Sequence, residues 1–248
     1  MKKRIGINIY AAVAGVALAA VTSAPVAAAR PRTIPLKEAT MIIEYNASAE
    51  DIGIQFFFDS EGWRTLEIFD PEGVEIFSAD TEGSIMEQGG GTELFLESVE
   101  PPIADLPFEE FFDRFPAGAY TFRAVDNDGI LQAGSVQFTH DIPAGPVLLT
   151  PVPSVHADCA KDVPRPVVIA WNPVTTSISG DPLGIVRYEV IVENDDLNFD
   201  VKFPATTGTL LTVSPELLEP NSDYIFEVLA VEASGNQTIT EGCFTTAR

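Results

Sequence analysis

Short runs of β-forming residues, separated by turn residues, recur along the chain from residue 39, and this pattern constrains the fold most. The runs that read as strands are residues 41–45, 52–58, 64–69, 74–77, 93–98, 120–125 and 135–140. Around the Asp70–Gly73 turn the flanking runs alternate polar and apolar side chains, which predicts a hairpin, and the Asp126–Gly129 turn predicts a second one. Strands at this spacing, without long helices, predict an all-β fold built of antiparallel sandwiches.

Residues 107–115 depart from the strand pattern. Phenylalanine occupies positions 108, 111, 112 and 115, which is the spacing of one helix face. Pro107 suits the first turn of a helix, and Pro116 stops it. We expect a short helix that packs its phenylalanines against one end of a sandwich. A ligand groove lined with phenylalanine is the alternative.

Prolines mark a boundary between two domains. Asp141–Pro146, followed by Pro151 and Pro153, has the composition of a stiff linker. The expected organisation is therefore an N-terminal extension over 30–38, a first β-sandwich domain over 39–142, a Pro-rich linker over 143–153 and a second domain over 154–248. The predicted fold class is two tandem β-sandwich domains, the first with one short helix near 107–115.

Three segments of the second domain carry a family resemblance. Val167–Pro173 contains Trp171, Arg187–Val192 contains Tyr188, and Leu218–Val231 reads Leu-x-Pro-x-x-x-Tyr-x-Phe-x-Val-x-Ala-Val. Together they resemble the second strand, the third strand and the tyrosine corner of a fibronectin type III domain. In the first domain, Phe115–Phe122 resembles segments of bacterial exported proteins described only as containing such domains, a resemblance that carries no activity.

The resemblance to fibronectin type III domains implies a set of core residues and one specific hydrogen bond. The Tyr224 hydroxyl is expected to bond to the backbone at the corner, while Phe226 points inward. The structural core residues implied by the resemblance are Trp171, Tyr188, Leu218, Pro220, Tyr224 and Phe226.

The amino terminus has the three-part pattern of a secretory signal peptide. Lys2, Lys3 and Arg4 precede the apolar stretch Ile5–Val21, and the small residues Ala27–Ala29 follow. We expect a signal peptide over 1–29 with cleavage after Ala29, Ala24 being the second choice and an uncleaved membrane anchor the alternative. The mature protein is expected to be periplasmic or extracellular, without a membrane span.

Export places the two cysteines in an oxidising compartment, where a pair of thiols usually forms one disulfide. Cys159 falls near the first strand of the second domain and Cys243 in its last strand. The expected bond would clamp both ends of that domain. A redox or metal-binding role for the pair is the alternative.

The charge excludes one class of partner. The chain has 14 Lys and Arg residues against 37 Asp and Glu, a formal net charge of -23 at pH 7. Nucleic-acid binding requires clustered basic residues, so no nucleic-acid partner is expected.

The sequence also predicts no catalytic residue. His140 and His156 are the only histidines, and neither lies in a nucleophile motif. His140 is read as a hydrogen-bonding group at a strand end. Gly89–Gly91 lacks the lysine of a phosphate-binding loop and reads as a flexible loop.

Two ligand hypotheses remain. Asp126 and Asp128 could supply oxygen ligands for calcium, although the same residues also suit a hairpin turn by themselves. No other cofactor is expected. Trp63 follows a probable loop and could stack on a sugar face, or it could begin the next strand and be half-buried.

The leading hypothesis is an exported, non-enzymatic protein whose tandem β-sandwich modules contact a protein or glycan of the cell envelope or the exterior. A carbohydrate-binding or accessory module of an extracellular system is the alternative. A small hydrolase with a carboxylate site is the third hypothesis.

Overall fold

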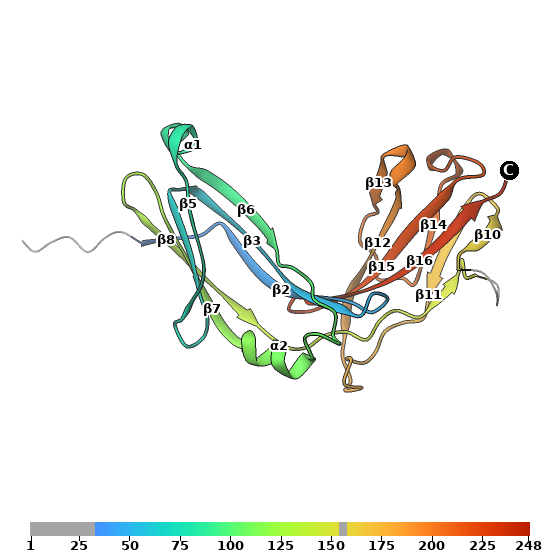
Figure 1. Ribbon diagram of the computed structural model, residues 1–248, viewed down its shortest axis with the longest axis horizontal. Helices are drawn as coiled ribbons and strands as arrows, with labels where there is room; N and C mark the ends of the chain where they lie inside the picture. The colour runs from blue at the N-terminus through green and yellow to red at the C-terminus, as the bar shows by residue number, and fades with distance from the viewer. Residues whose placement is uncertain (1–32, 154–157) are drawn as a thin grey trace, which may run out of the picture. The chain divides into compact units, whose positions relative to one another are not determined.

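The computed structural model describes residues 33–153 and 158–248, and nearly all of its regular structure is β-strand (Figure 1). This confirms the all-β fold class. The predicted signal peptide over 1–29 lies outside the described residues. No helix in the described part of the chain has the length and apolar character needed to cross a bilayer.

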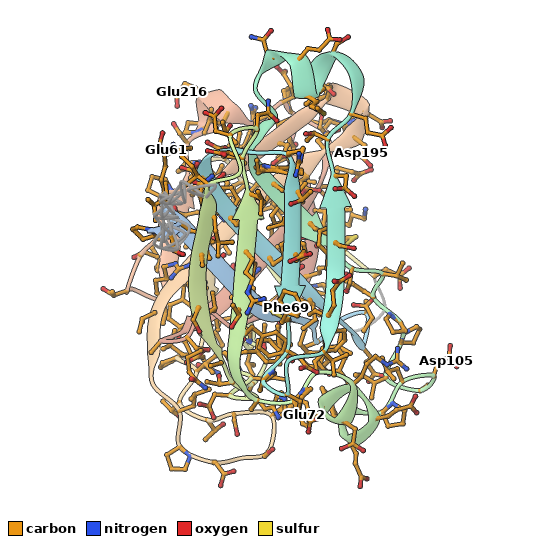
Figure 2. The ribbon with its side chains drawn as sticks, turned by 90° about the vertical axis from the view of Figure 1, so that its left-hand side faces the viewer. Glu61, Phe69, Glu72, Asp105, Asp195 and Glu216 are labelled. Carbon is orange, nitrogen blue, oxygen red and sulfur yellow. A yellow bond between two sulfur atoms is a disulfide. The ribbon has the colours of Figure 1, made fainter. Side chains whose placement is uncertain are left out.

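The first sheet has five strands in the order β1-β8-β7-β4-β5, and it faces the viewer in Figure 2. Its strands are β1 (Thr33–Pro35), β4 (Thr65–Phe69), β5 (Glu75–Asp80), β7 (Gly118–Val125) and β8 (Leu131–Phe138). Both predicted hairpins, β4–β5 and β7–β8, are present. Within the expected extension over 30–38, residues 33–35 form β1, which pairs with β8 in parallel and so belongs to the sheet.

The second sheet has eight strands and is built from both halves of the chain. Its order is β13-β12-β15-β16-β2-β3-β6, and β10 also pairs with β16. The strands are β2 (Glu38–Asn46), β3 (Asp51–Trp63), β6 (Gly91–Glu97), β10 (Ala160–Val163), β12 (Ile185–Asn194), β13 (Phe199–Lys202), β15 (Asp223–Glu232) and β16 (Gln237–Thr246). The parallel pairing of β2 with β16 joins strands that two separate tandem sandwiches would keep apart.

The third sheet comprises β14 (Leu210–Val213), β11 (Val167–Trp171) and β9 (Leu148–Thr150). Strand β9 lies inside the stretch 143–153 that we expected to be a Pro-rich linker. It pairs with β11, and Leu148 packs against the second hydrophobic core. Three residues of the predicted Pro-rich linker therefore belong to a sheet, because the apolar residues between the prolines pair with β11.

The helices are short. They are α1 (Gly83–Gln88), α2 (Phe108–Arg114) and the 3₁₀ turns η1 (Asp195–Leu197) and η2 (Pro215–Leu217). Helix α2 confirms the prediction over 107–115: Phe111 is buried, and Phe108, Phe112 and Phe115 pack against the first core. Helix α1 was not predicted, and it ends at Gly89, whose φ of 122° suits glycine.

Two hydrophobic cores lie between the sheets. The first contains Phe58, Tyr120 and Phe122 among the buried side chains between Met41 and Ile142. The second contains buried side chains between Ala160 and Phe244, with Trp171 and Phe226 among the largest. The eight-stranded sheet borders both cores.

Candidate functional site

The residues of the tyrosine corner act as structural groups. The Tyr224 hydroxyl accepts a hydrogen bond from the backbone N–H of Glu219 at 2.8 Å, and the Tyr188 hydroxyl accepts one from Val174 N–H at 2.8 Å. Trp171, Tyr188, Leu218, Tyr224 and Phe226 are buried. Pro220, expected in the same core, is exposed, because it lies on the outside of the corner that precedes β15.

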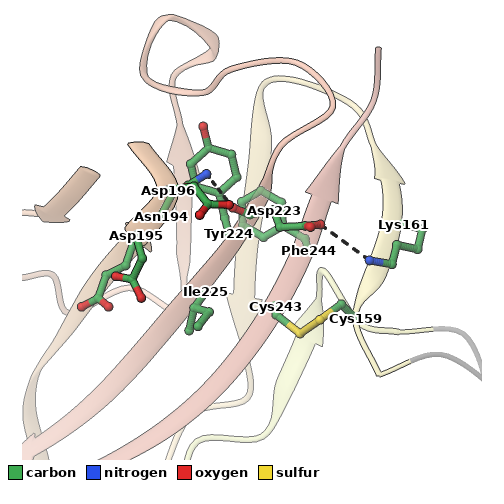
Figure 3. Close-up of a pocket in the computed structure, with 11 residues that line it drawn as sticks. Cys159, Lys161, Asn194, Asp195, Asp196, Asp223, Tyr224, Ile225, Cys243 and Phe244 are labelled. Carbon is green, nitrogen blue, oxygen red and sulfur yellow. Dashed lines mark hydrogen bonds and ion pairs between the residues drawn. A yellow bond between two sulfur atoms is a disulfide. The ribbon is translucent and has the colours of Figure 1, made fainter. Parts of the chain in front are cut away.

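Cys159 and Cys243 form a disulfide with a Cα–Cα distance of 4.9 Å (Figure 3). The bond ties the residue before β10 to the middle of β16, beside the parallel pairing of these two strands. The two cysteines therefore form the disulfide that was expected between the ends of the second domain.

An open pocket of about 340 Å³ lies beside the disulfide (Figure 3). Lys161 Nζ lies 3.6 Å from the Asp223 carboxylate, and Asn194 donates to the Asp223 carbonyl at 2.7 Å. Asp195 and Asp196 of η1 lie along the opposite wall. The pocket thus combines one cation with several carboxylates.

The Asp126 carboxylate closes a turn. Its Oδ1 accepts hydrogen bonds from Asp128 N–H at 2.9 Å and from Ile130 N–H at 2.8 Å. Gly129 has a φ of 79°, which this tight turn requires. The contacts support the turn interpretation of Asp126 and Asp128, and calcium binding there stays the alternative hypothesis.

Trp63 is neither an exposed residue after a loop nor the half-buried start of the next strand. Trp63 ends β3 and is 6% exposed, and its ring packs against Phe58 at a centroid distance of 5.8 Å. A Cβ atom at Gly91 would lie 2.6 Å from the indole, so the ring and the glycine backbone are in close contact. A ring covered in this way has no free face on which a sugar could stack.

His140, two residues beyond the end of β8, forms the expected hydrogen bond, and its partner lies at the end of α2. Its Nε2 lies 2.8 Å from the Phe115 carbonyl oxygen, and its ring stacks on Phe112 at 4.1 Å. The histidine therefore anchors the helix to the segment that follows β8.

Three glutamates that sequence reasoning did not single out come together on the outer face of the eight-stranded sheet. Glu44 of β2, Glu97 of β6 and Glu100 each offer a carboxylate oxygen, and these oxygens lie within 4.8 Å of one another. Glu44 is buried and accepts a hydrogen bond from the side-chain amide of Gln237. Gly53 lies opposite Glu44, and its missing side chain leaves room for the Glu100 side chain against the backbone.

The surroundings disfavour the charged forms of these carboxyl groups. Burial, and then the neighbouring charges of Glu44, Glu97 and Asp51, raise the pKa of Glu100 to about 7. Burial also raises the pKa of Glu44. A hard cation such as Ca²⁺ requires six to eight oxygen ligands, so this triad would form only part of such a site.

The acidic character continues onto the strands of the second half. Burial, and then the charges of Glu193 and Glu241, raise the pKa of Glu227 in β15 to about 7. Glu227 lies opposite Glu241 of β16, and Glu44 lies opposite Gln237 of the same strand. Because residues 237 and 241 are four positions apart in one strand, Glu44 and Glu227 lie on the same side of the sheet. We call this surface the acidic face and define it by Glu44, Glu97, Glu100, Glu193, Glu227 and Glu241.

The sequence contains one weak signal for this face. Glu44 interrupts the apolar run 41–45, as a residue on the outer side of a half-buried strand does. Its proximity to Gln237 depends on the pairing of β2 with β16, and neither strand carries a local pattern that specifies this partner.

No protein-family model matches the chain, and no curated protein matches it. Among solved structures it is similar to the FN1–FN3 domains of chicken CNTN1, with 13% identity over 88% of this chain and 65% of that one and a TM-score of 0.31. It is also similar to domains A168–A170 from titin, with 15% identity over 86% and 68% and a TM-score of 0.28.

A third similar structure concerns the host cell surface retention of a 1.5-MDa bacterial ice-binding adhesin, with 12% identity over 84% of this chain and 64% of that one and a TM-score of 0.27. The chain spans less than two thirds of the first and third of these structures. Because all three TM-scores are below 0.5, the similarities assign no function to this chain.

Proposed function

We propose that this chain is an exported, non-catalytic binding protein whose two cores form one rigid body. The observation that carries the proposal is the joint between the halves of the chain, where β2 and β16 pair and buried side chains bond to backbone groups. A rigid body holds its surfaces in fixed relation, which lowers the entropy that a partner must remove on binding.

Asn236 is the central side chain of this joint. Its side chain is buried, with 1% of the residue exposed. The Oδ1 atom accepts a hydrogen bond from the backbone N–H of Ile43 at 2.8 Å. The Nδ2 atom donates hydrogen bonds to the carbonyl oxygens of Thr139 at 3.1 Å and Asp141 at 3.2 Å. Breaking the joint would leave these buried groups without partners until water replaced them. Their mutual satisfaction therefore favours the closed joint.

Thr238 adds a second buried contact. Its hydroxyl is fully buried and donates to the Pro143 carbonyl oxygen at 2.6 Å. Residues 139–143, which link the two halves along the chain, are thus bonded to the turn and first residues of β16. The chain connection and the sheet pairing support the same arrangement.

The disulfide supports the export part of the proposal. A bond between Cys159 and Cys243 persists in the periplasm or outside the cell, where no thiol pool reduces it. The non-catalytic part is supported by the structural contacts of the groups considered for chemistry, since His140 anchors α2 and Asp126 closes a turn.

The test is a capture experiment. The tagged mature protein is cross-linked to an envelope fraction of the source cells, and the recovered material is identified. The same chain, reduced and unfolded, is the control bait. Enrichment of a discrete protein or glycan by the folded bait is expected, and equal recovery by both baits would overturn the binding role.

A further inference from the structure

Strand β6 forms one edge of the eight-stranded sheet. It has seven residues and pairs only with β3 within the described part of the chain, so its other side has no strand neighbour there (Figure 1). Backbone N–H and C=O groups along such an edge are a template for pairing with another extended segment.

An aromatic residue stands in the middle of this edge. Phe95 is 58% exposed, whereas its neighbours Leu94 and Leu96 pack against the first core. Phe95 lies opposite Phe57 of β3, so the two rings occupy the same outer side of the sheet. An exposed aromatic side chain beside a free strand edge offers apolar contact area to a partner strand.

Carboxylates flank the phenylalanine. Glu93 and Glu97 lie two residues before and after Phe95, on the same side of the strand, and Glu97 adjoins Glu44 and Glu100 of the acidic face. Within the described residues, no lysine or arginine forms an ion pair with Glu93, Glu97 or Glu100. Burial and then the charges of Glu44, Glu97 and Asp51 raise the pKa of Glu100, and a cation supplied from outside would relieve the repulsive part of this effect.

The same charges determine which occupant fits. A second copy pairing through β6 would bring Glu93 and Glu97 close to their counterparts, and like charges on neighbouring strands are destabilising. A strand bearing lysine or arginine at alternate positions would instead face both carboxylates while its backbone pairs with β6.

We propose that the free edge of β6 binds an extended, lysine- or arginine-bearing segment of a partner protein, which adds to the eight-stranded sheet as a further strand beside Phe95. This assignment rests on the binding role proposed above and specifies its partner class. The affinity comes from main-chain hydrogen bonds, and the selectivity comes from Glu93, Glu97 and Phe95.

The first experiment uses three labelled peptides on the full mature protein. The probe alternates lysine and valine, the charge control replaces lysine with glutamate, and the pairing control replaces valine with proline, which removes strand N–H donors. Fluorescence anisotropy is expected to show binding of the probe, with each control weaker by about tenfold or more. Equal binding of the proline peptide would overturn strand addition.

Variants place the binding on β6. Glu93→Lys/Glu97→Lys is expected to lower the affinity for the probe peptide by about tenfold or more. Glu72→Lys/Glu75→Lys makes the same change in charge in the turn before β5 and at its first residue, at the edge of the other sheet, and is expected to bind the probe as wild type does (Figure 2 labels Glu72). All four glutamates are exposed, so both variants should fold. An equal loss in the two variants would overturn the assignment.

A repeat of the capture experiment separates the two proposals. If the wild-type bait and the Glu93→Lys/Glu97→Lys bait recover the same partner equally, the β6 assignment is overturned and the binding role stands. If the wild-type bait recovers nothing beyond the unfolded control, the binding role itself fails. Self-association that is lost in the β6 variant would assign the edge to a second copy and overturn the basic partner.

Discussion

The carboxylate of Glu44 in β2 accepts a hydrogen bond from the side-chain amide of Gln237 in β16, 193 residues further along the chain. Both side chains are buried, and their strands pair in parallel at these two residues. This contact joins the halves of the chain within one sheet and lies at the centre of the acidic face.

The acidic face predicts that stability decreases as the pH rises. Glu100 and Glu227 have folded pKa values of about 7 against an ordinary value of 4.5, so the folded state binds more protons between these limits. The stabilisation of the folded state by these protons is fully present below pH 4.5 and is lost as the pH rises through about 7. Urea unfolding between about pH 5 and about pH 8 should show a loss of about 1–2 kcal/mol, allowing for solvent screening.

Two substitutions check the origin of this pH dependence. Glu100→Gln and Glu227→Gln should each flatten the slope, because the neutral amide does not titrate. Glu189 forms ion pairs with Lys202 and Arg187, and its pKa is lowered. Its effect on stability therefore falls below pH 4.5 and does not change the slope between about pH 5 and about pH 8. An unchanged slope in both variants would assign the pH dependence to other groups.

Removal of the disulfide should lower stability strongly. Cys159 and Cys243 are separated by 84 residues, and closing a loop of this length is worth about 4 kcal/mol in the chain-entropy model. Cys159→Ala/Cys243→Ala should show this loss in chemical unfolding. Reductant should destabilise the wild type by a similar amount and leave the variant unchanged, and a reductant effect on the variant would contradict the assignment.

The hydroxyl at the tyrosine corner should contribute measurably. Tyr224→Phe leaves Glu219 N–H without its acceptor and should cost about 1 kcal/mol. Tyr120, in the first core, donates a similar local bond to the Pro116 carbonyl at 3.1 Å, so Tyr120→Phe provides a matched comparison. Stability equal to wild type for Tyr224→Phe would show that the corner bond is dispensable.

Trp63 should behave as a core residue and not as a sugar platform. Trp63→Ala should cost about 3–5 kcal/mol, because the ring fills space beside Phe58 and Gly91. The milder Trp63→Phe should leave retention on polysaccharide columns unchanged. A specific loss of retention in a stably folded Trp63→Phe protein would restore the glycan hypothesis.

The Asp126 turn should be independent of calcium. Asp126→Ala removes the acceptor of two backbone N–H groups and should cost about 1 kcal/mol. Millimolar Ca²⁺ should not change the difference in melting temperature between wild type and this variant. A Ca²⁺-dependent difference would show that Asp126 is a metal ligand.

Local signals in the sequence predicted the longer strands, whereas the short strands β1, β9, β13 and β14 were missed. The alternation over 64–69 and 74–77 specified β4 and β5, and the corner motif specified the contact between Tyr224 and Glu219. These features depend on neighbouring residues, so the sequence contains them directly. The proline-rich stretch misled us, because the three residues of β9 are too few to show a period of their own.

Long-range contacts could not be predicted in the same way. Gly90 read as part of a flexible loop, yet a Cβ atom there would lie 2.0 Å from the Trp63 carbonyl oxygen. That constraint comes from a residue 27 positions earlier, and no local pattern records it. The acidic face is hidden for the same reason, since it depends on the pairing of β2 with β16.

The parallel pairing of β2 with β16 also has a mechanical consequence. Tension applied through the residue before β2 and the residue after β16 pulls the two strands in opposite directions along their length. The backbone bonds between Glu44–Asn46 and Gln237–Ile239 are then loaded together, in shear, rather than one after another. A chain built in this way resists extension at the point where its two cores meet.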